Sequence, residues 1–111
     1  MATGSLDRTF SALGDPVRRS IVQSLLDRPA TVGEIADPFE MSRPAVSKHL
    51  RVLREAGIVE SRAIGRQNWY SVRPDALDEA SHWLDGVHAM WATALGSLKD
   101  YLEEERNGDG E

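Results

Sequence analysis

The sequence predicts a mainly α-helical domain with one small β-hairpin, a fold of the α+β class, in the order α-α-α-α-β-β-α. Three observations support this order. Apolar residues recur at helical spacing in the first half of the chain, the spacing shortens to about two residues after Gly57, and helical spacing returns after Pro74. We expect a disordered N-terminus over residues 1–5, one folded domain over 6–105 and a disordered tail over 106–111.

The first two helices are predicted by apolar spacing and by the residues between them. Apolar side chains at positions i, i+4 and i+7 indicate a short amphipathic helix, namely Leu6, Phe10 and Leu13. Gly14 ends this helix. Asp15 and Pro16 begin the next one, because aspartate caps helix N-termini and proline needs no hydrogen-bond acceptor in the first turn. We expect the second helix to end near Pro29.

The third and fourth helices carry their own start and stop signals. Thr31 and Glu34 have the T-x-x-E spacing of a capping box, in which each side chain bonds the backbone N–H of the other residue. We expect the third helix to end before Pro38, since the residue preceding a proline disfavours helical geometry. Ser42 is placed to cap the fourth helix, and Gly57 is placed to end it.

A β-hairpin and a long helix complete the predicted domain. The segments IVESRAI and QNWYSV flank Gly65 and Arg66, which indicates a hairpin with a glycine-containing tip. Trp69 and Tyr70 are neighbours on the second strand and point to opposite sides, and the sequence leaves open which of them packs beneath the hairpin. Pro74 should open the last helix, with acidic residues in its first turns, where the helix dipole favours negative charge.

The composition excludes several classes of function. The 111 residues include no cysteine, which rules out disulfides, thiolate metal sites and cysteine nucleophiles. No run of about 18 apolar residues occurs, so we expect no membrane span and no membrane partner. The N-terminus lacks the basic start and apolar block of a secretory signal, and we expect a cytoplasmic protein. No Ser-His-Asp order, paired-carboxylate motif or phosphate-binding loop appears, so we expect no catalytic residues and no enzyme.

Positive charge is concentrated in the middle of an acidic chain. The net charge is −5, but residues 41–73 contain 7 basic and 2 acidic side chains, which gives this segment a charge of +5. The flanking segments, 1–40 and 74–111, carry charges of −2 and −8. Phosphates respond to a local basic patch at short range, whatever the net charge of the protein. The charge distribution therefore favours nucleic acid as a partner.

The predicted fourth helix has one apolar face and one basic face. The polar stripe comprises Pro44, Ser47, Lys48, Arg51 and Glu55, with Arg43 and Arg54 at its edge. Val46, Leu50 and Leu53 cluster opposite it, so the helix should pack by that face and present the stripe to a major groove. His49 lies on the apolar side, where we expect a boundary histidine bonded to the backbone or to a phosphate. Alone, this pattern also fits an ordinary solvated helix face.

The neighbouring elements favour the DNA-binding interpretation. A short capped helix, a tight turn, the basic helix and a basic hairpin are the parts of a winged helix-turn-helix, with 31–57 as the helix-turn-helix and 58–73 as the wing. We therefore predict double-stranded DNA as the partner. The predicted DNA-binding residues are Ser42, Arg43, Pro44, Ser47, Lys48, Arg51, Arg62 and Arg66. The alternative is a winged domain that has lost DNA binding and acts as a protein-interaction module.

The last helix, expected over 74–105, carries a broad apolar stripe with alternating steps of three and four residues. One small domain would not cover so wide a stripe, so we predict a homodimer formed by the first and last helices. The predicted interface residues are Leu6, Phe10, Leu13, Leu84, Val87, Trp91, Leu95 and Leu98. Trp83, Met90 and Trp91 also suggest a pocket for an unknown apolar small-molecule effector, although aromatic stripes of this kind are usually core.

The segments ALGDPVRRSIV, MSRPAVSKHLRVLREAGIVE and GRQNWYSV resemble the ArsR/SmtB family of winged-helix repressors, and the resemblance covers about residues 6–104. Its most specific part is the pattern S-x-x-x-V-S-x-H-L-x-x-L-x-x-A-G, which runs from Ser42 to Gly57. The resemblance implies a dimeric repressor or autorepressor that binds a palindromic operator. It also implies that gain or loss of a ligand changes the affinity for DNA.

The sequence departs from the metal-responsive members of that family. These members carry a C-V-C motif at the start of the third helix, where this chain has Thr31, Val32 and Gly33. Neither a hydroxyl group nor a hydrogen atom replaces a thiolate toward a soft metal. His82 and His88 lie about 240° apart around the last helix and do not share a face. We expect no metal and no other cofactor; the alternative is a metal-responsive repressor with a non-thiolate site.

Overall fold

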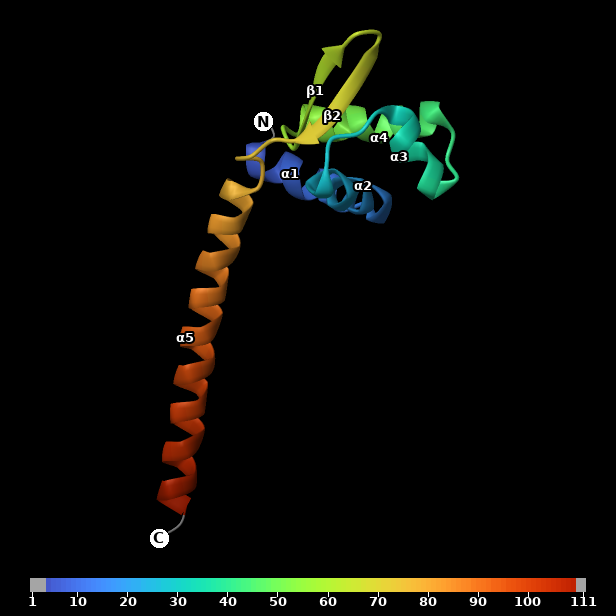
Figure 1. The fold of residues 1–111 in the computed structure, drawn as a ribbon. Helices are drawn as coiled ribbons and strands as arrows, with labels where there is room; N and C mark the ends of the chain where they lie inside the picture. The colour runs from blue at the N-terminus through green and yellow to red at the C-terminus, as the bar shows by residue number, and fades with distance from the viewer. Residues whose placement is uncertain (1–3, 110–111) are drawn as a thin grey trace. The chain divides into compact units, whose positions relative to one another are not determined.

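The computed structural model describes residues 4–109, and its elements follow the predicted order (Figure 1). They are α1 (Ser5–Leu13), α2 (Pro16–Asp27), α3 (Val32–Phe39), α4 (Arg43–Glu55), β1 (Val59–Ile64), β2 (Gln67–Val72) and α5 (Asp78–Asp109). The predicted fold class is therefore confirmed. The chain divides into two compact units, one extending through Ala80 and the other beginning at Ser81, within α5.

Two helix starts are formed by the caps that the sequence predicts. Asp15 Oδ1 accepts hydrogen bonds from the N–H groups of Val17 at 2.8 Å and Arg18 at 3.1 Å, at the start of α2. The bond from the Arg18 N–H is the main reason why the pKa of Asp15 lies below its ordinary value. At α3, the Glu34 N–H donates to Thr31 Oγ1 at 3.3 Å and the Thr31 N–H donates to Glu34 Oε1 at 3.3 Å, which completes the capping box.

The end of α3 differs from the prediction. The helix continues through Pro38 and ends at Phe39. Proline is accommodated because it lies in the last turn, where its missing N–H removes only one hydrogen bond. Glu40 then ends the helix in the left-handed conformation, with a φ of 53°, and its N–H donates to the carbonyl oxygen of Asp37 at 3.3 Å. The prediction that the helix ends before the proline was therefore wrong by two residues.

The last helix begins later than expected. The chain at Pro74 forms tight turns, in which the N–H groups of Ala76 and Asp78 donate to carbonyl oxygens three residues earlier, at 3.0 and 3.3 Å. Regular helical hydrogen bonding starts only at Asp78, so α5 begins four residues after the predicted position. Asp78 and Glu79 still occupy its first turn, where negative charge is favourable.

Both ends that we expected to be disordered are partly helical. Ser5 begins α1, whose first turn is closed by a hydrogen bond from the Arg8 N–H to the Gly4 carbonyl oxygen at 3.1 Å. At the other end, α5 continues past the expected limit at 105 and includes Arg106 through Asp109. The rest of these two ends, 1–3 and 110–111, lies outside the described residues.

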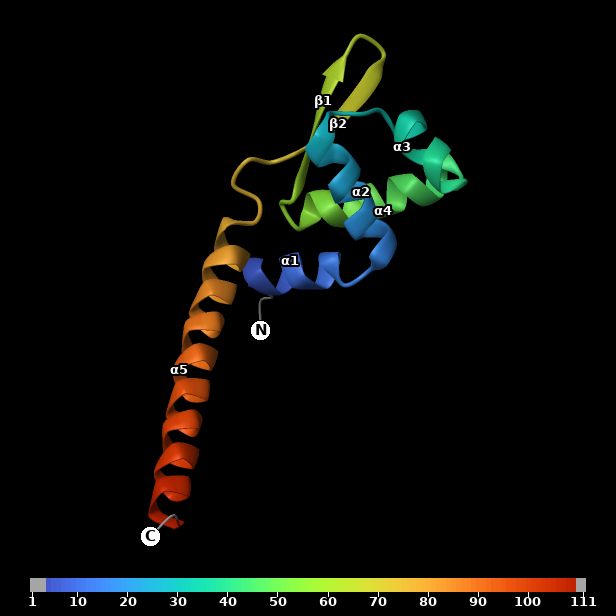
Figure 2. The ribbon, with the colours of Figure 1, turned by 60° about the horizontal axis from the view of Figure 1, so that its bottom comes forward.

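The core of the first unit lies where α1, α2 and α4 meet the hairpin, and Figure 2 shows α2 crossing α4 beneath it. The least accessible large side chains are Ile21, Val46, Leu50, Leu53 and Ile58. Burial of each such side chain contributes roughly 1.5–3 kcal/mol. Three of the five belong to α4, so this helix is held in place by its apolar face, as its sequence pattern predicts.

The hairpin has the predicted tip and an uninterrupted register. The pairs run from Val59 opposite Val72 to Ile64 opposite Gln67, which leaves Gly65 and Arg66 as the two-residue connection. Gly65 has a φ of 64°, a conformation that glycine adopts without strain and that two-residue hairpin turns require at their first central position.

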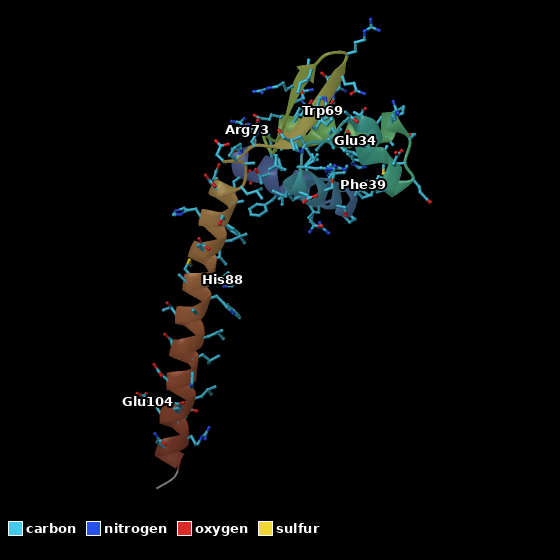
Figure 3. All side chains as sticks on the ribbon, in the orientation of Figure 1. Glu34, Phe39, Trp69, Arg73, His88 and Glu104 are labelled. Carbon is cyan, nitrogen blue, oxygen red and sulfur yellow. The ribbon has the colours of Figure 1, made fainter. Side chains whose placement is uncertain are left out.

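A backbone bridge attaches the hairpin to the helices. The Ala30 N–H donates to the Tyr70 carbonyl oxygen at 3.0 Å, and the Tyr70 N–H donates to the Ala30 carbonyl oxygen at 2.8 Å. This pairing places β2 beside the start of α3. Tyr70 is only 8% exposed and belongs to the core, whereas Trp69, on the other face of β2, is half-buried (Figure 3). Tyr70 is thus the aromatic residue beneath the hairpin.

Candidate nucleic-acid interface

The start of α4 has the predicted cap. The Ser42 Oγ accepts a hydrogen bond from the Ala45 N–H at 3.3 Å, and Pro44 lies in the first turn, where a backbone donor is not needed. Because these residues fix the first turn, the side chains of Arg43 and Ser47 leave the helix in defined directions.

The end of α4 is a Schellman motif. The Gly57 N–H donates to the Arg54 carbonyl oxygen at 2.9 Å, and the Ile58 N–H donates to the Leu53 carbonyl oxygen at 3.0 Å. Gly57 has a φ of 76°, which permits this reversal without a clash from Cβ. The chain enters β1 at once, so a single glycine turn sets the direction of the wing relative to the helix.

The two faces of α4 are separated as the helical wheel predicts. Val46, Leu50 and Leu53 are at most 1% exposed and pack into the core. The residues predicted to bind DNA are all exposed, on α4 and its cap and on the hairpin: Ser42, Arg43, Pro44, Ser47, Lys48, Arg51, Arg62 and Arg66. The helix is therefore held from one side and presents its polar stripe on the other.

A groove of about 290 Å³ runs along α4 where it meets β2. We call it the α4 groove, and it is lined by Pro44, Ser47, Lys48, Arg51, Arg54 and Tyr70. Three of these residues are cationic and none is acidic. Arg54, at the edge of the predicted stripe, was not among the residues that the sequence predicted to bind DNA. In the structure, Arg54 and Tyr70 of the hairpin line the α4 groove together.

The basic side chains predicted on α4 and near the tip of the hairpin have no intramolecular partners among the described residues. Within residues 4–109, neither a hydrogen bond nor an ion pair engages the side chains of Arg43, Lys48, Arg51, Arg54, Arg62 and Arg66. Other arginines are engaged: Arg18 Nε and Arg19 Nη1 each donate at 2.6 Å to carbonyl oxygens at the end of α1, and Arg73 pairs with Asp75 at 3.6 Å. The unpaired cations of α4 and the wing remain available to an external polyanion.

His49 lies at the boundary of the core, as the sequence suggests. It is half-buried on α4, and its Nδ1 is buried without a hydrogen-bond partner among the described residues. Nδ1 therefore does not make a bond to the backbone, which was one of the two contacts expected of this residue. The other expected contact, between the imidazole of His49 and a phosphate, stays a prediction.

The histidines considered as metal ligands lie on α5. His82 and His88 are both exposed, and His88 is labelled in Figure 3. Over the part of the chain that the structure describes, no group of three or more His, Asp or Glu side chains is placed to hold a metal ion. No helix within residues 4–109 has both the length and the apolar character needed to cross a membrane.

Helix α5 by itself carries a stripe of exposed apolar side chains. Leu84, Val87, Leu95 and Leu98 are 40–53% exposed, and Trp91 is 63% exposed. Of the apolar residues predicted on α1, Leu6 and Leu13 are half-buried, and Leu13 packs against the core of the first unit. A stripe as long as that on α5 is unusual for a surface in contact with water.

Known proteins share this arrangement. Residues 15–61 match the family described as bacterial regulatory proteins of the arsR family. The HTH-type transcriptional regulator Rv2034 of Mycobacterium tuberculosis is 39% identical over 101 residues, which cover 91% of this chain and 92% of that protein. The transcriptional repressor SdpR of Bacillus subtilis is 32% identical over 71% of this chain and 88% of its own length.

Solved structures agree with these relatives. An ArsR-like transcriptional regulator from Rhodococcus sp. RHA1 is similar with a TM-score of 0.74 and 30% identity, covering 86% of this chain and 91% of that one. These relatives are transcriptional regulators, so the prediction that the chain is not an enzyme is confirmed. The chain belongs to the arsR family of bacterial regulatory proteins and is a DNA-binding transcriptional regulator with a winged helix-turn-helix fold.

Proposed function

We propose that the protein is a dimeric repressor that binds a palindromic operator, with α4 in the major groove and the hairpin on the adjacent backbone. The observation that carries this proposal is the set of unpaired cations on α4 and the wing, described above. Neutralising phosphates with such side chains releases counterions from the DNA, and this release supplies a large part of the affinity. Ser47, Lys48 and Arg51, on the stripe opposite the core, are the residues that we assign to base edges and nearby phosphates.

The apolar stripe of α5 supports the dimer. Its exposed side chains include Leu84, Trp91 and Leu98, and burying each large apolar side chain against a second copy would contribute roughly 1.5–3 kcal/mol. Several such contacts exceed the association cost of a specific dimer. A two-fold axis would present two α4 helices to successive major grooves, about 34 Å apart, and would account for a palindromic operator.

The proposal is tested with the purified protein and a fluorescent duplex that carries the DNA upstream of its own gene. Anisotropy is measured at two salt concentrations, with a scrambled duplex as the control. Selective binding that weakens with salt is expected, and equally weak binding to both duplexes would contradict the assignment. The variant Lys48→Glu with Arg51→Glu should abolish selective binding and leave the dimer intact.

A matched control separates the location of the charge from its amount. Arg28→Glu with Lys99→Glu changes the net charge by the same amount, at exposed positions on α5 and beyond the end of α2. This variant should retain most of the affinity. If both double variants lose affinity equally, the effect comes from the overall charge, and α4 is not the DNA-binding surface.

A further inference from the structure

A second polar hollow lies beside the α4 groove. It has a volume of about 180 Å³ and is lined by Thr31, Val32, Gly33, Arg43, Gln67 and Asn68. We call it the Arg43 notch. Three elements contribute to it: the start of α3, the first residue of α4 and the first two residues of β2. The backbone bridge between Ala30 and Tyr70 accounts for this meeting, because antiparallel pairing continued from it sets Asn68 beside Val32.

The guanidinium of Arg43 lies directly on Gly33. A Cβ atom built on Gly33 would be 2.9 Å from Arg43 Nη2 and 3.2 Å from Arg43 Cζ, distances shorter than van der Waals contact. Any larger residue at this position would therefore displace the guanidinium. The hydrogen atom of glycine lets the charged group pack against the first turn of α3.

The position of Arg43 separates it from the residues that line the α4 groove. It does not line that groove, whereas Ser47, Lys48 and Arg51 do. Its guanidinium has neither a hydrogen bond nor an ion pair within residues 4–109. The described lining of the notch offers no carboxylate, and it includes two neutral residues whose amide groups can donate hydrogen bonds, Gln67 and Asn68. One cation with two neutral donors suits a singly charged oxyanion.

We propose that Arg43, positioned by Gly33, binds one backbone phosphate of the DNA in the Arg43 notch, with Gln67 and Asn68 as additional donors, and reads no base. This inference rests on the proposed function. A phosphate held here would contact α3, α4 and the wing together, so it would set the depth and angle at which α4 enters the major groove. Arg43 is thus a positioning residue for sequence recognition by the rest of α4.

The first test compares Arg43→Ala with the unsubstituted protein on the upstream duplex and on the scrambled duplex, over a series of salt concentrations. If Arg43 contacts a phosphate, the affinity for both duplexes should fall roughly tenfold, and the ratio of the two affinities should stay unchanged. It also predicts that the slope of log affinity against log salt becomes shallower by about 1. A changed affinity ratio would mean that Arg43 reads a base, which would overturn the inference.

The second test is a double-mutant cycle with Gly33→Ala. The added methyl group should push the guanidinium out of the notch and lower the affinity for both duplexes about threefold. In the Arg43→Ala background the same substitution should have no further effect, because nothing is left to displace. Gly108→Ala, which adds a methyl group where no described atom lies within 4 Å, is the control and should leave binding unchanged.

The outcomes distinguish this inference from the function on which it rests. If Lys48→Glu with Arg51→Glu abolishes binding but Arg43→Ala has no effect, the proposed function stands and the inference is wrong. If Gly33→Ala weakens binding equally with and without Arg43, the methyl group acts elsewhere, and the inference is again wrong. If the unsubstituted protein binds neither duplex, the proposed function fails and this inference fails with it. Thermal unfolding followed by circular dichroism checks that each variant is folded.

Discussion

The glycine that ends α4 allows the cost of a substitution to be worked out from backbone conformation alone. Gly57 has a φ of 76°, and a Cβ added to it would meet no described atom within 4 Å. Steric overlap therefore adds nothing, and Gly57→Ala should lower the free energy of unfolding only by the strain of an L-residue in the left-handed region, about 1–2 kcal/mol. Gly57→Asn should cost clearly less, because asparagine tolerates this conformation.

The assay is urea unfolding followed by circular dichroism at a fixed protein concentration. Gly86→Ala provides a matched control: it also adds a methyl group in open space, but within regular helix, where alanine is more favourable than glycine by about 1 kcal/mol. The two alanine variants should therefore shift the unfolding midpoint in opposite directions.

Two results would refute this reasoning. A loss above about 3 kcal/mol for Gly57→Ala would mean that the methyl group meets something, so strain could not be the whole cost. An asparagine variant as unstable as the alanine variant would mean that the left-handed conformation is not what position 57 requires, and the Schellman arrangement would have to be abandoned.

Further predictions concern the core, the cap of α2 and the stripe on α5. Leu50→Ala, at a site 1% exposed, should lower the free energy of unfolding by about 2–5 kcal/mol, whereas Leu26→Ala, at a site 63% exposed, should change it little in the same urea assay. The pKa of Asp15 is lowered in the folded state, so its carboxylate stabilises the fold above the ordinary value of 3.8, and this contribution is lost as the pH falls through the folded-state pKa. The stability advantage of the protein over Asp15→Asn should accordingly shrink as the pH is lowered from about 5, and an advantage independent of pH would contradict this. Trp91→Glu should raise the dimer dissociation constant at least about 100-fold in sedimentation experiments, and an unchanged dimer would exclude this face of α5 from the interface.

Local signals made most of the fold predictable. The capping box of Thr31 and Glu34, the cap at Asp15 and the turn at Gly57 are each written within a few consecutive residues, so their chemistry determines the helix ends without help from the rest of the chain. The proline in α3 misled the prediction because its effect depends on how many turns follow it. Pro38 lies in the last turn, where little helix remains to be disrupted.

The parts of the site that the sequence did not reveal depend on contacts between distant residues. The pairing of Ala30 with Tyr70 joins residues far apart in the chain, and no local pattern announces it. This pairing decides which aromatic side chain packs beneath the hairpin. It also brings the start of β2 to Gly33 and Arg43, and helical periodicity cannot indicate such a meeting.

The unpaired cations of α4 and the wing have a consequence for the free protein. Like charges gathered on one face repel one another, and within the described residues no carboxylate pairs with them. In the unbound domain, the repulsion between these charges therefore lowers the stability of the fold. DNA relieves this repulsion when it binds, and occupancy should raise the thermal stability of the domain by an amount that the DNA affinity and concentration set. Replacing these cations by neutral residues should raise the free energy of unfolding and lower the affinity for DNA. The residues that serve recognition thus reduce the stability of the unbound domain.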